Sequence, residues 1–283
     1  MPNLPTFVLF NRFPPRRARV REALAFMDQR GWGRLSLAVH SDLSVFLAEV
    51  VPTKCDVVGV DTSACSQPSS CVGVVEQVKA VAPTKPILLL ASEGELTSRD
   101  WMRASEVGVA ELVLDEEDHD AVAIARRIRS VSGISRALEV IQSLRGQVPA
   151  HWVKMLKRGL MRARRTTADD VGLTPELLAD LWNRGASLAQ LEWFLRKDGA
   201  WTPGWVVRWL ICLRAVSLSS VRPSWGAVAS DLGFSRRDDL RAFVRRFAGV
   251  REDELTVERL KDEFLQRNHR PNAADGEREG TMP

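Results

Sequence analysis

Long hydrophobic runs and clustered metal ligands are both missing from this chain of 283 residues. No apolar run approaches the ~18–20 residues of a membrane-spanning helix, and the N-terminus lacks the apolar core of a secretory signal. Only four histidines are present, and the four cysteines, Cys55, Cys65, Cys71 and Cys212, have no zinc-binding spacing. We therefore expect a cytoplasmic protein without metal or other cofactor, whose thiols are buried and reduced. A Cys65–Cys71 bridge or redox sensor is the alternative.

Catalytic sequence motifs are missing as well. No G-x-G-x-x-G or G-x-x-x-x-G-K-[ST] segment follows a strand, so the chain lacks the usual phosphate-binding loops. The G-x-S-x-G and H-E-x-x-H patterns of hydrolases and zinc proteases are also missing. We therefore expect no enzymatic activity and no catalytic residues.

Tyrosine is absent, whereas the chain has nine tryptophans, most of them between Trp152 and Trp225. Large aromatic side chains in a helical segment usually belong to its core. We expect most of these tryptophans to be buried, and Trp193 and Trp201 to be the exposed ones.

Short apolar runs alternate with amphipathic stretches through the first 133 residues. The apolar runs are 6–10, 35–39, 56–60, 87–90 and 111–114, and the amphipathic stretches between and after them are 16–29, 42–49, 73–81, 99–108 and 118–131. Strands that alternate with helices predict a doubly wound parallel α/β sheet of the flavodoxin-like type.

Residues 224–250 have the pattern of two short helices joined by a tight turn. Val228 and Leu232 belong to an apolar stripe at helical spacing, and Gly233 suits a turn that requires a positive φ. Ser235 is the predicted N-cap of a second, basic helix. Its arginines are Arg236, Arg237, Arg241, Arg245 and Arg246. This pattern is typical of a helix-turn-helix, whose second helix enters the DNA major groove. A helical hairpin with solvated arginines is the alternative.

A second pair of the same kind precedes it. Thr174 and Pro175 start one helix, residues 183–185 break it, and Ser187 caps the next. Residues 204–219 then form a long apolar helix. The predicted order is therefore one helix-turn-helix, a connecting helix, and another helix-turn-helix.

The segment 173–250 resembles the tandem helix-turn-helix DNA-binding domain of AraC-type transcription regulators. The matching residues are Gly185, Ser187, Leu191, Gly199, Thr202 and Pro203 in the first pair, 208–214 in the connecting helix, and Val228, Ala229, Leu232, Gly233, Phe234, Leu240 and Gly249 in the second pair. The chain departs from the family at Glu192 and Trp193, where basic or polar residues are usual, and at Ala242, where an arginine is usual.

Positive charge is concentrated in this half of the chain. Basic residues outnumber acidic ones over 151–222, whereas acidic residues slightly outnumber basic ones over 1–133. Such a balance is expected where phosphates are neutralised. The resemblance implies DNA contacts from Ser235, Arg236, Arg237, Arg241 and Arg245 in the second pair, from Leu188, Ala189 and Gln190 in the first, and to phosphates from Lys157, Arg162 and Arg164. Arg236 or Arg237 is the candidate for reading guanine.

The first half resembles a response-regulator receiver domain that has lost part of its chemistry. Asp61 follows an apolar run at the position of the phospho-accepting aspartate, and Asp115 lies where the family has a lysine. Asn11 and Arg12 replace the acidic pair that binds Mg²⁺. Phosphoryl transfer to an aspartate needs that metal and that lysine to neutralise the developing charge. We therefore expect Asp61 to be a vestigial acceptor that caps or hydrogen-bonds at a strand end.

Together these features predict a two-domain transcription regulator that binds double-stranded DNA. We expect a degenerate receiver-like domain over 1–133, a helical linker over 134–150, an all-α tandem helix-turn-helix domain over 151–266, and a disordered tail over 267–283. The first domain would serve homodimerisation or docking of a protein partner, and no membrane partner is expected. Two alternatives stay open: an interaction adaptor that no longer binds DNA, and a phosphorylation-dependent response regulator.

Overall fold

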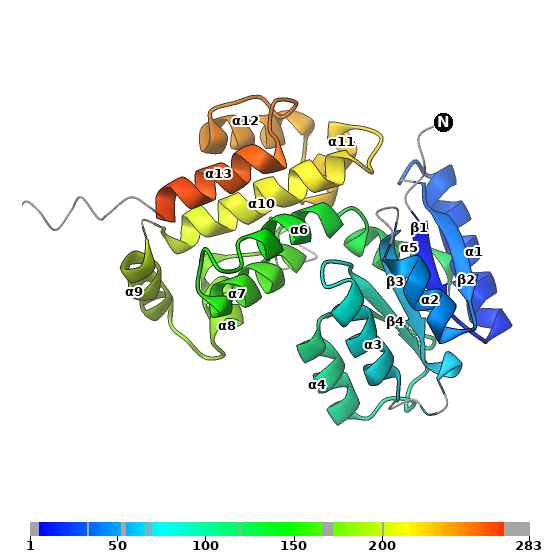
Figure 1. Ribbon diagram of the computed structural model, residues 1–283. Helices are drawn as coiled ribbons and strands as arrows, with labels where there is room; N and C mark the ends of the chain where they lie inside the picture. Colours follow the sequence, from blue (N-terminus) through cyan, green and yellow to red (C-terminus); the bar gives the residue numbers. More distant parts are fainter. Residues whose placement is uncertain are drawn as a thin grey trace, which may run out of the picture. The chain divides into compact units, whose positions relative to one another are not determined.

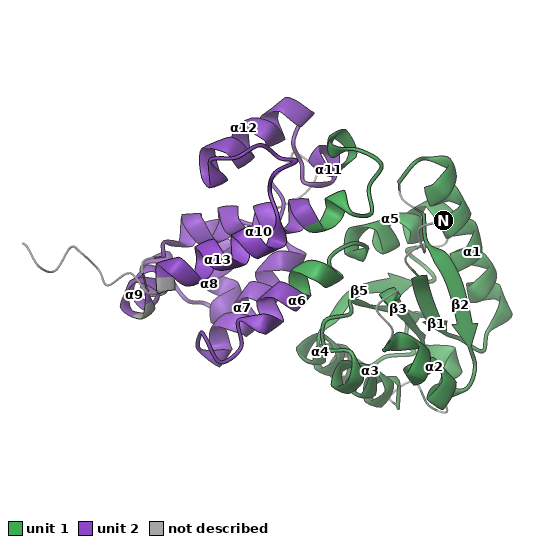
Figure 2. Ribbon diagram, turned by 45° about the horizontal axis from the view of Figure 1, so that its top comes forward, with its two compact units in different colours: residues 1–138, 217–227 green, residues 139–216, 228–283 purple. Residues whose placement is uncertain are grey.

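The chain forms two compact units in the computed structural model (Figure 1, Figure 2). The first unit comprises Met1–Leu138 and Ser217–Ala227, and the second comprises Glu139–Val216 and Val228–Pro283. The predicted linker, 134–150, is thus divided between the two units. The structure describes residues 6–32, 34–51, 55–65, 67, 70–118, 120–165, 172–199 and 201–268. Most of the predicted tail, 269–283, lies outside the described residues.

The first unit is built on a five-stranded parallel sheet. Its strands are β1 (Thr6–Phe10), β2 (Ser36–His40), β3 (Cys55–Asp61), β4 (Ile87–Ala91) and β5 (Val109–Leu114). They lie in the order β2-β1-β3-β4-β5, and every neighbouring pair is parallel. This order is that of the flavodoxin-like fold. The predicted α/β architecture, which receiver domains share, is therefore confirmed for this unit.

Helices cover both faces of this sheet (Figure 1). On one face, α1 (Pro14–Gln29) packs against α5 (Ala121–Val131). On the other face lie α2 (Leu43–Val50), α3 (Ser70–Val81) and α4 (Ser98–Val107), each packed against the next. Because both faces are covered, the central strands are almost continuously apolar and buried, as parallel sheets require.

Local side-chain chemistry sets the ends of these helices. Asp42 and Asp120 cap the first turns of α2 and α5 by accepting hydrogen bonds from backbone N–H groups. Thr97 and Asp100 form a reciprocal capping box at the start of α4, which ends at Gly108 with a φ of 107°. These signals are encoded within a few residues, which is why the sequence places the helices nearly where they occur.

The remaining described helices follow the five-stranded sheet in sequence. They are α6 (Ser135–Ser143), α7 (Ala150–Met161), α8 (Pro175–Trp182), α9 (Leu188–Asp198), α10 (Pro203–Ser219), α11 (Trp225–Asp231), α12 (Arg237–Ala248) and α13 (Val257–Asn268). Short portions of α6, α10 and α11 belong to the first unit and the rest to the second. None of the helices within the described ranges combines the length and the apolarity that crossing a membrane requires.

Aromatic side chains form the centre of the second unit. The Trp201 ring lies 4.9 Å from that of Trp152 and 5.1 Å from that of Phe264, between ring centroids, and is fully buried. The prediction that Trp201 is exposed was therefore wrong. The Trp201 ring lies against Gly199. A Cβ atom added at Gly199 would be only 2.3 Å from the nearest atom of that ring. The prediction for Trp193 is confirmed, because 60% of that residue is exposed.

The thiol prediction was correct for two of the four cysteines. Cys55 and Cys212 are free and buried. Cys65 and Cys71 are joined by a disulfide, so the expectation of reduced thiols was wrong for this pair. The 3-10 turn η1 (Thr62–Ala64) and the start of α3 bring their Cα atoms to 5.7 Å, within bridging distance.

Candidate functional site

The carboxyl ends of the parallel strands gather a cluster of polar side chains around Arg16. Asp61 is the last residue of β3, Ser92 directly follows β4, and Asp115 directly follows β5. Parallel strands end at the same edge of a sheet, so these residues meet there. Arg16 approaches them from the first turn of α1, which follows β1. We call this group, with Thr62 and Glu95, the arginine cluster.

Every N–H donor of the Arg16 guanidinium is used within this cluster. Three donors bind carboxylates: Nη1 lies 2.6 Å from Asp61, Nε 2.8 Å from Asp115 and Nη2 3.0 Å from Glu95. The other two bind hydroxyls, because Nη2 lies 2.6 Å from the oxygen of Ser92 and Nη1 3.1 Å from that of Thr62. A guanidinium has five such donors, so Arg16 is fully satisfied. Its side chain is 2% exposed.

The charges in the cluster stabilise one another. Burial alone lowers the pKa of Arg16, but the charges and hydrogen bonds of Asp61 and Asp115 outweigh it, so that its pKa is raised. Burial raises the pKa of Asp115, yet hydrogen bonds from Arg16 and Ser92 leave it below its ordinary value. The pKa of Glu95 is lowered in the same way by Thr62, the Ser92 backbone and Arg16. The site is therefore a set of internal ion pairs.

Asp61 is enclosed within this arrangement. It is fully buried, it accepts a hydrogen bond from the Asn11 amide, and it caps η1 by accepting one from the Ser63 N–H at 2.8 Å. Arg12 lies apart and donates to the Ser41 carbonyl. Sequence reasoning missed Arg16, which supplies the cation from α1. Among the described residues, no group of three or more His, Cys, Asp or Glu side chains is placed to hold a metal ion.

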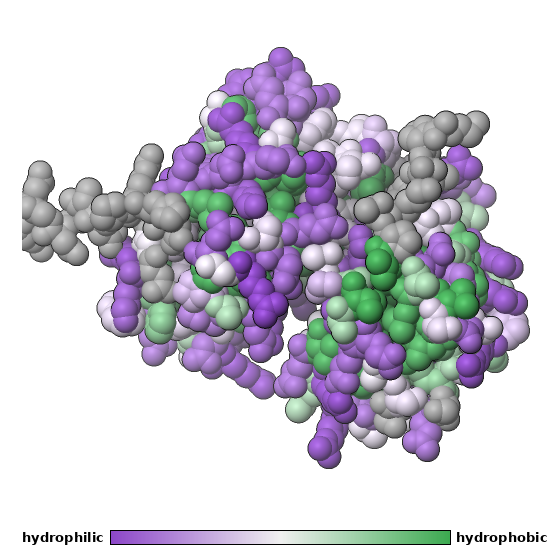
Figure 3. All heavy atoms as spheres, in the orientation of Figure 1, coloured by the Kyte–Doolittle hydropathy of each residue, from purple (hydrophilic) through white to green (hydrophobic). Residues whose placement is uncertain are grey.

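Helix α12 carries the predicted DNA-binding arginines on the second unit. The N-cap prediction for Ser235 was wrong by one residue: Arg236 occupies that position, and its N–H donates to Asp239 at 3.1 Å. The Asp239 carboxylate, at the third helical position, thus accepts the N–H of the N-cap residue, which is one half of a capping box. Ser235, Arg236 and Arg245 are exposed, and Figure 3 shows mostly hydrophilic residues over this helix.

Two of these arginines share one buried carboxylate. Glu252, 1% exposed, binds Nη2 of Arg237 at 2.9 Å and Nε of Arg241 at 3.0 Å. The arginine side chains themselves remain 50% and 38% exposed. Burial raises the pKa of Glu252, but its backbone hydrogen bond and the two arginines lower the pKa by more than burial raises it. The pKa is therefore below its ordinary value, and the group is a carboxylate at neutral pH. Sequence reasoning missed Glu252, which lies beyond the helix that it supports.

Helix α9 presents a different surface. Gln190, a predicted base reader, accepts the Ser187 N–H through its side-chain oxygen at 2.8 Å, so that oxygen completes a capping box. The Ser187 cap itself is confirmed. Ala189 is exposed and Leu188 is half-buried. The exposed Trp193 ring has the Lys197 ammonium 5.3 Å from its centroid.

The predicted phosphate contacts come from α7 and the residues after it. Arg162 is exposed at the C-terminal end of α7, and Arg164 is half-buried. Lys157 is half-buried and donates to the Gln142 side chain. Burial and the neighbouring charge of Arg145 lower the pKa of Lys157.

Comparison with known proteins gives structural neighbours but no family. No protein-family model matches the chain, and no curated protein matches it. The structure is similar to that of full-length FixJ from B. japonicum, with 13% identity, a TM-score of 0.36, and coverage of 88% of this chain and 100% of that one. It is also similar to NtrX from Brucella abortus in complex with ADP, with 13% identity and a TM-score of 0.35. That match covers 57% of this chain and only 35% of the NtrX chain.

Proposed function

We propose that this chain is a sequence-specific DNA-binding transcription regulator with a tandem, AraC-like helix-turn-helix domain. Its receiver-like domain works without phosphorylation of Asp61, and the protein has no enzymatic activity. The observation that carries the proposal is the arginine pair on α12, Arg237 and Arg241, which Glu252 holds at the protein surface.

Two helix pairs support this assignment. The turn between α8 and α9 contains Gly185 with a φ of 77°, and the turn between α11 and α12 contains Gly233 with a φ of 74°. Only glycine adopts this conformation at little cost, so both tight turns depend on it. Helix α10, which lies between the pairs in sequence, is buried along most of its length. A basic second helix after such a turn is the arrangement that enters a major groove.

The anchored arginines have the chemistry for reading guanine. Arg237 uses Nε and Nη2 on Glu252, while Arg241 uses Nε there and Nη1 on Asp238. Nη1 of Arg237 and Nη2 of Arg241 make no hydrogen bond among the described residues. A guanidinium whose orientation is fixed on one side loses less side-chain entropy when its free donors reach the O6 and N7 acceptors of guanine.

In the receiver-like domain, by contrast, the charged groups of the arginine cluster are buried or half-buried and paired with one another. Phosphorylation would place further negative charge on Asp61, which is fully buried and already paired with Arg16. The cation that such chemistry needs at the end of β5 is replaced by Asp115, which itself binds Arg16. We therefore assign this domain a role in dimerisation or partner docking. Hydrophobic residues gather over α2 in Figure 3. Val45 of this helix and Val51, which directly follows it, are more than half exposed.

The test is a selection of genomic DNA fragments by the purified full chain at increasing salt, followed by sequencing of the retained fragments. A recurrent motif, with affinity that falls steeply as salt rises, is the expected result. Retention without a motif would indicate a non-specific binder and contradict the proposal. The absence of any retention at low salt would also overturn it.

A second candidate function, a protein-interaction adaptor, is favoured by one observation on α9. Trp193 is 60% exposed, and tryptophan is enriched among the residues that dominate protein interfaces. Its position in the helix is one where a DNA reader would carry a polar side chain. The adaptor hypothesis predicts that Trp193→Ala abolishes partner binding, whereas the DNA hypothesis predicts that Arg237→Ala abolishes motif enrichment.

A further inference from the structure

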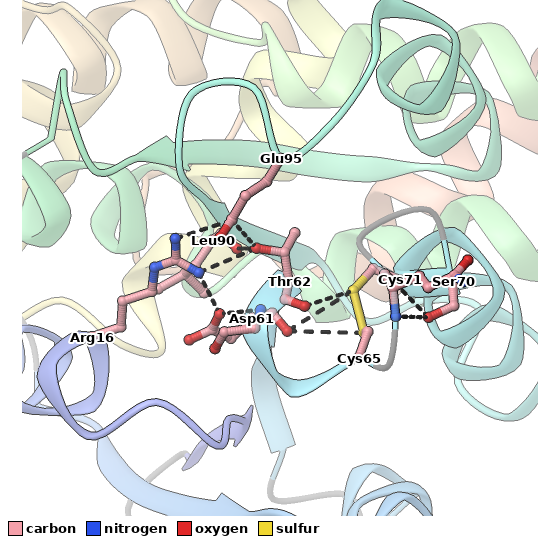
Figure 4. The surroundings of a disulfide bond; sticks show 10 residues. Arg16, Asp61, Thr62, Cys65, Ser70, Cys71, Leu90 and Glu95 are labelled. Atoms are coloured by element: carbon pink, nitrogen blue, oxygen red, sulfur yellow. Dashed lines mark hydrogen bonds and ion pairs between the residues drawn. A yellow bond between two sulfur atoms is a disulfide. The ribbon is translucent and has the colours of Figure 1, made fainter.

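The disulfide of the first unit adjoins the arginine cluster. Cys65 directly follows η1, and Cys71 is the second residue of α3. Figure 4 shows the bridge beside Asp61 and Thr62, on the side away from Arg16. The bridge thus joins the segment after β3 to the start of the next helix.

Both sulfur atoms contact the backbone of the residues that hold Arg16. Each sulfur lies 3.9 Å from the Asp61 carbonyl oxygen, and the Cys71 sulfur lies 3.6 Å from that of Thr62. The side chains of Asp61 and Thr62 both accept hydrogen bonds from Nη1 of Arg16. The turn that contacts the two sulfurs is therefore joined to the guanidinium by two hydrogen bonds.

We propose that Cys65 and Cys71 form a reversible redox site, and that its oxidation state sets the arrangement of the arginine cluster. The site takes the place of phosphorylation as the input to this domain. Its partners are a dithiol reductant and a disulfide oxidant, of either protein or small-molecule origin.

The chemistry is thiol–disulfide exchange. A thiolate of the reductant attacks the sulfur of Cys65, which is half-buried, while Cys71 is fully buried and leaves as a thiolate that takes up a proton. The second thiol of the reductant then displaces Cys65, which leaves as a thiolate and is protonated in turn. Two electrons and two protons pass to the protein, and the reductant becomes a disulfide. A disulfide oxidant reverses these steps.

The surroundings of the two sulfurs provide hydrogen-bond acceptors for the reduced state. In the reduced state each thiol gains an S–H donor, and the carbonyl oxygens of Asp61 and Thr62 are within reach as acceptors. The two free cysteines differ: burial raises the pKa of Cys55 to about 12, and burial also raises that of Cys212. Thiols held in their neutral form are poor nucleophiles. Exchange is thus directed to the Cys65–Cys71 pair.

A purely structural bridge is the competing interpretation. It closes a loop with a sequence separation of only six residues, which constrains the unfolded chain less than a long loop would. So small a stabilisation favours a switch over a purely structural bridge.

The experiment compares the full chain after treatment with dithiothreitol and after treatment with glutathione disulfide. Alkylation and intact-mass measurement count the free thiols, and hydrogen exchange is followed in peptides that cover residues 58–64 and 87–95. We expect two additional thiols in the reduced protein, and exchange in both peptides at least several-fold faster than in the oxidised protein. Cys65→Ser should show the same exchange under both treatments, whereas Cys55→Ala should respond as the wild type does.

Two results would overturn the proposal. One is a bridge that does not form with glutathione disulfide or that resists dithiothreitol in the folded protein. The other is a bridge that opens while exchange in the two peptides stays the same. Neither measurement involves DNA, so its failure is distinct from a failure of the proposed DNA binding.

Discussion

The Arg16 guanidinium lies 2.6 Å from the Asp61 carboxylate, and neither side chain is more than 2% exposed. The aspartate at the end of the third strand is thus neutralised by a cation from the first helix of the same domain. A buried charge that loses its partner is costly, because the low-dielectric interior cannot replace the lost interaction. This pair therefore joins the end of β3 to the start of α1 through a buried ion pair.

Arg16→Ala should destabilise the protein strongly. The substitution leaves Asp61 buried and deprives Asp115 and Glu95 of a shared partner. Removing one member of a buried ion pair costs about 3–5 kcal/mol. Urea unfolding followed by circular dichroism measures the loss. The matched control is Arg19→Ala, which removes a partly exposed partner of Asp115 and should cost less than about 1 kcal/mol. Equal effects of the two variants would contradict the role given to Arg16.

Asp61 should not accept a phosphoryl group. Incubation of the full chain with acetyl phosphate and Mg²⁺ is expected to leave its intact mass unchanged, because Asp61 is fully buried and bound to Arg16 and Asn11. Phosphoryl transfer also requires charge neutralisation by a metal, and the described residues include no group of three or more His, Cys, Asp or Glu side chains placed to hold one. An added phosphoryl mass that disappears in Asp61→Asn would restore the phosphorylation-dependent response regulator as the better hypothesis.

The arginine cluster should make the free energy of unfolding decrease as the pH falls in the acidic range. The pKa of Asp115 is lowered from 3.8 and that of Glu95 from 4.5, so the folded protein binds fewer protons than the unfolded chain in this range. Their contribution is complete above these ordinary values and is lost as the pH falls through the lowered ones. Urea midpoints measured across the acidic range should fall less steeply for Glu95→Gln than for the wild type. Parallel curves would show that Glu95 adds nothing to the acid dependence.

Arg237→Ala should reduce affinity for the selected motif more than affinity for random DNA. An arginine that reads a base contributes about 1–3 kcal/mol to the preferred sequence. Fluorescence anisotropy with motif and scrambled duplexes measures both affinities. Arg245→Ala serves as the comparison. If the exposed Arg245 contacts only phosphate, its loss should weaken binding to both duplexes equally. Equal losses on the two duplexes for Arg237→Ala would leave it as a phosphate contact.

Glu252→Gln should distinguish the effect of arginine orientation on DNA binding from the effect of surface charge. The change removes the carboxylate that binds Arg237 and Arg241, so the two side chains become free to rotate while the surface gains net positive charge. We expect weaker binding to the motif together with unchanged or tighter binding to scrambled DNA. Asp253→Asn is the matched control, because it removes the same charge from the exposed pair with Arg251. A Glu252→Gln protein with wild-type discrimination would show that the anchored geometry is not used.

The secondary structure of this chain could largely be predicted from local patterns. Strand β1 has the predicted bounds, and the Ser187 and Thr174 caps start α9 and α8 where the sequence indicates. The helix-to-strand alternation also predicted the parallel flavodoxin-like sheet. These features depend on residues a few positions apart, so the order of residues is sufficient to reveal them. The error at Ser235 has a local cause too, since the Asp239 carboxylate accepts the Arg236 N–H and the N-cap is Arg236.

The arginine cluster could not be predicted in the same way. Arg16 is separated from Asp61 by 45 residues and from Asp115 by 99, and nothing near Arg16 in the sequence distinguishes it from the other arginines of α1. The burial of Trp201 and the pairing of Cys65 with Cys71 likewise depend on neighbours that only the folded chain supplies. Periodicity and caps in the sequence thus determined the elements and the class of sheet. The tertiary structure alone decided which charge meets Asp61, because that choice depends on which side chains the packed helices bring to the strand ends.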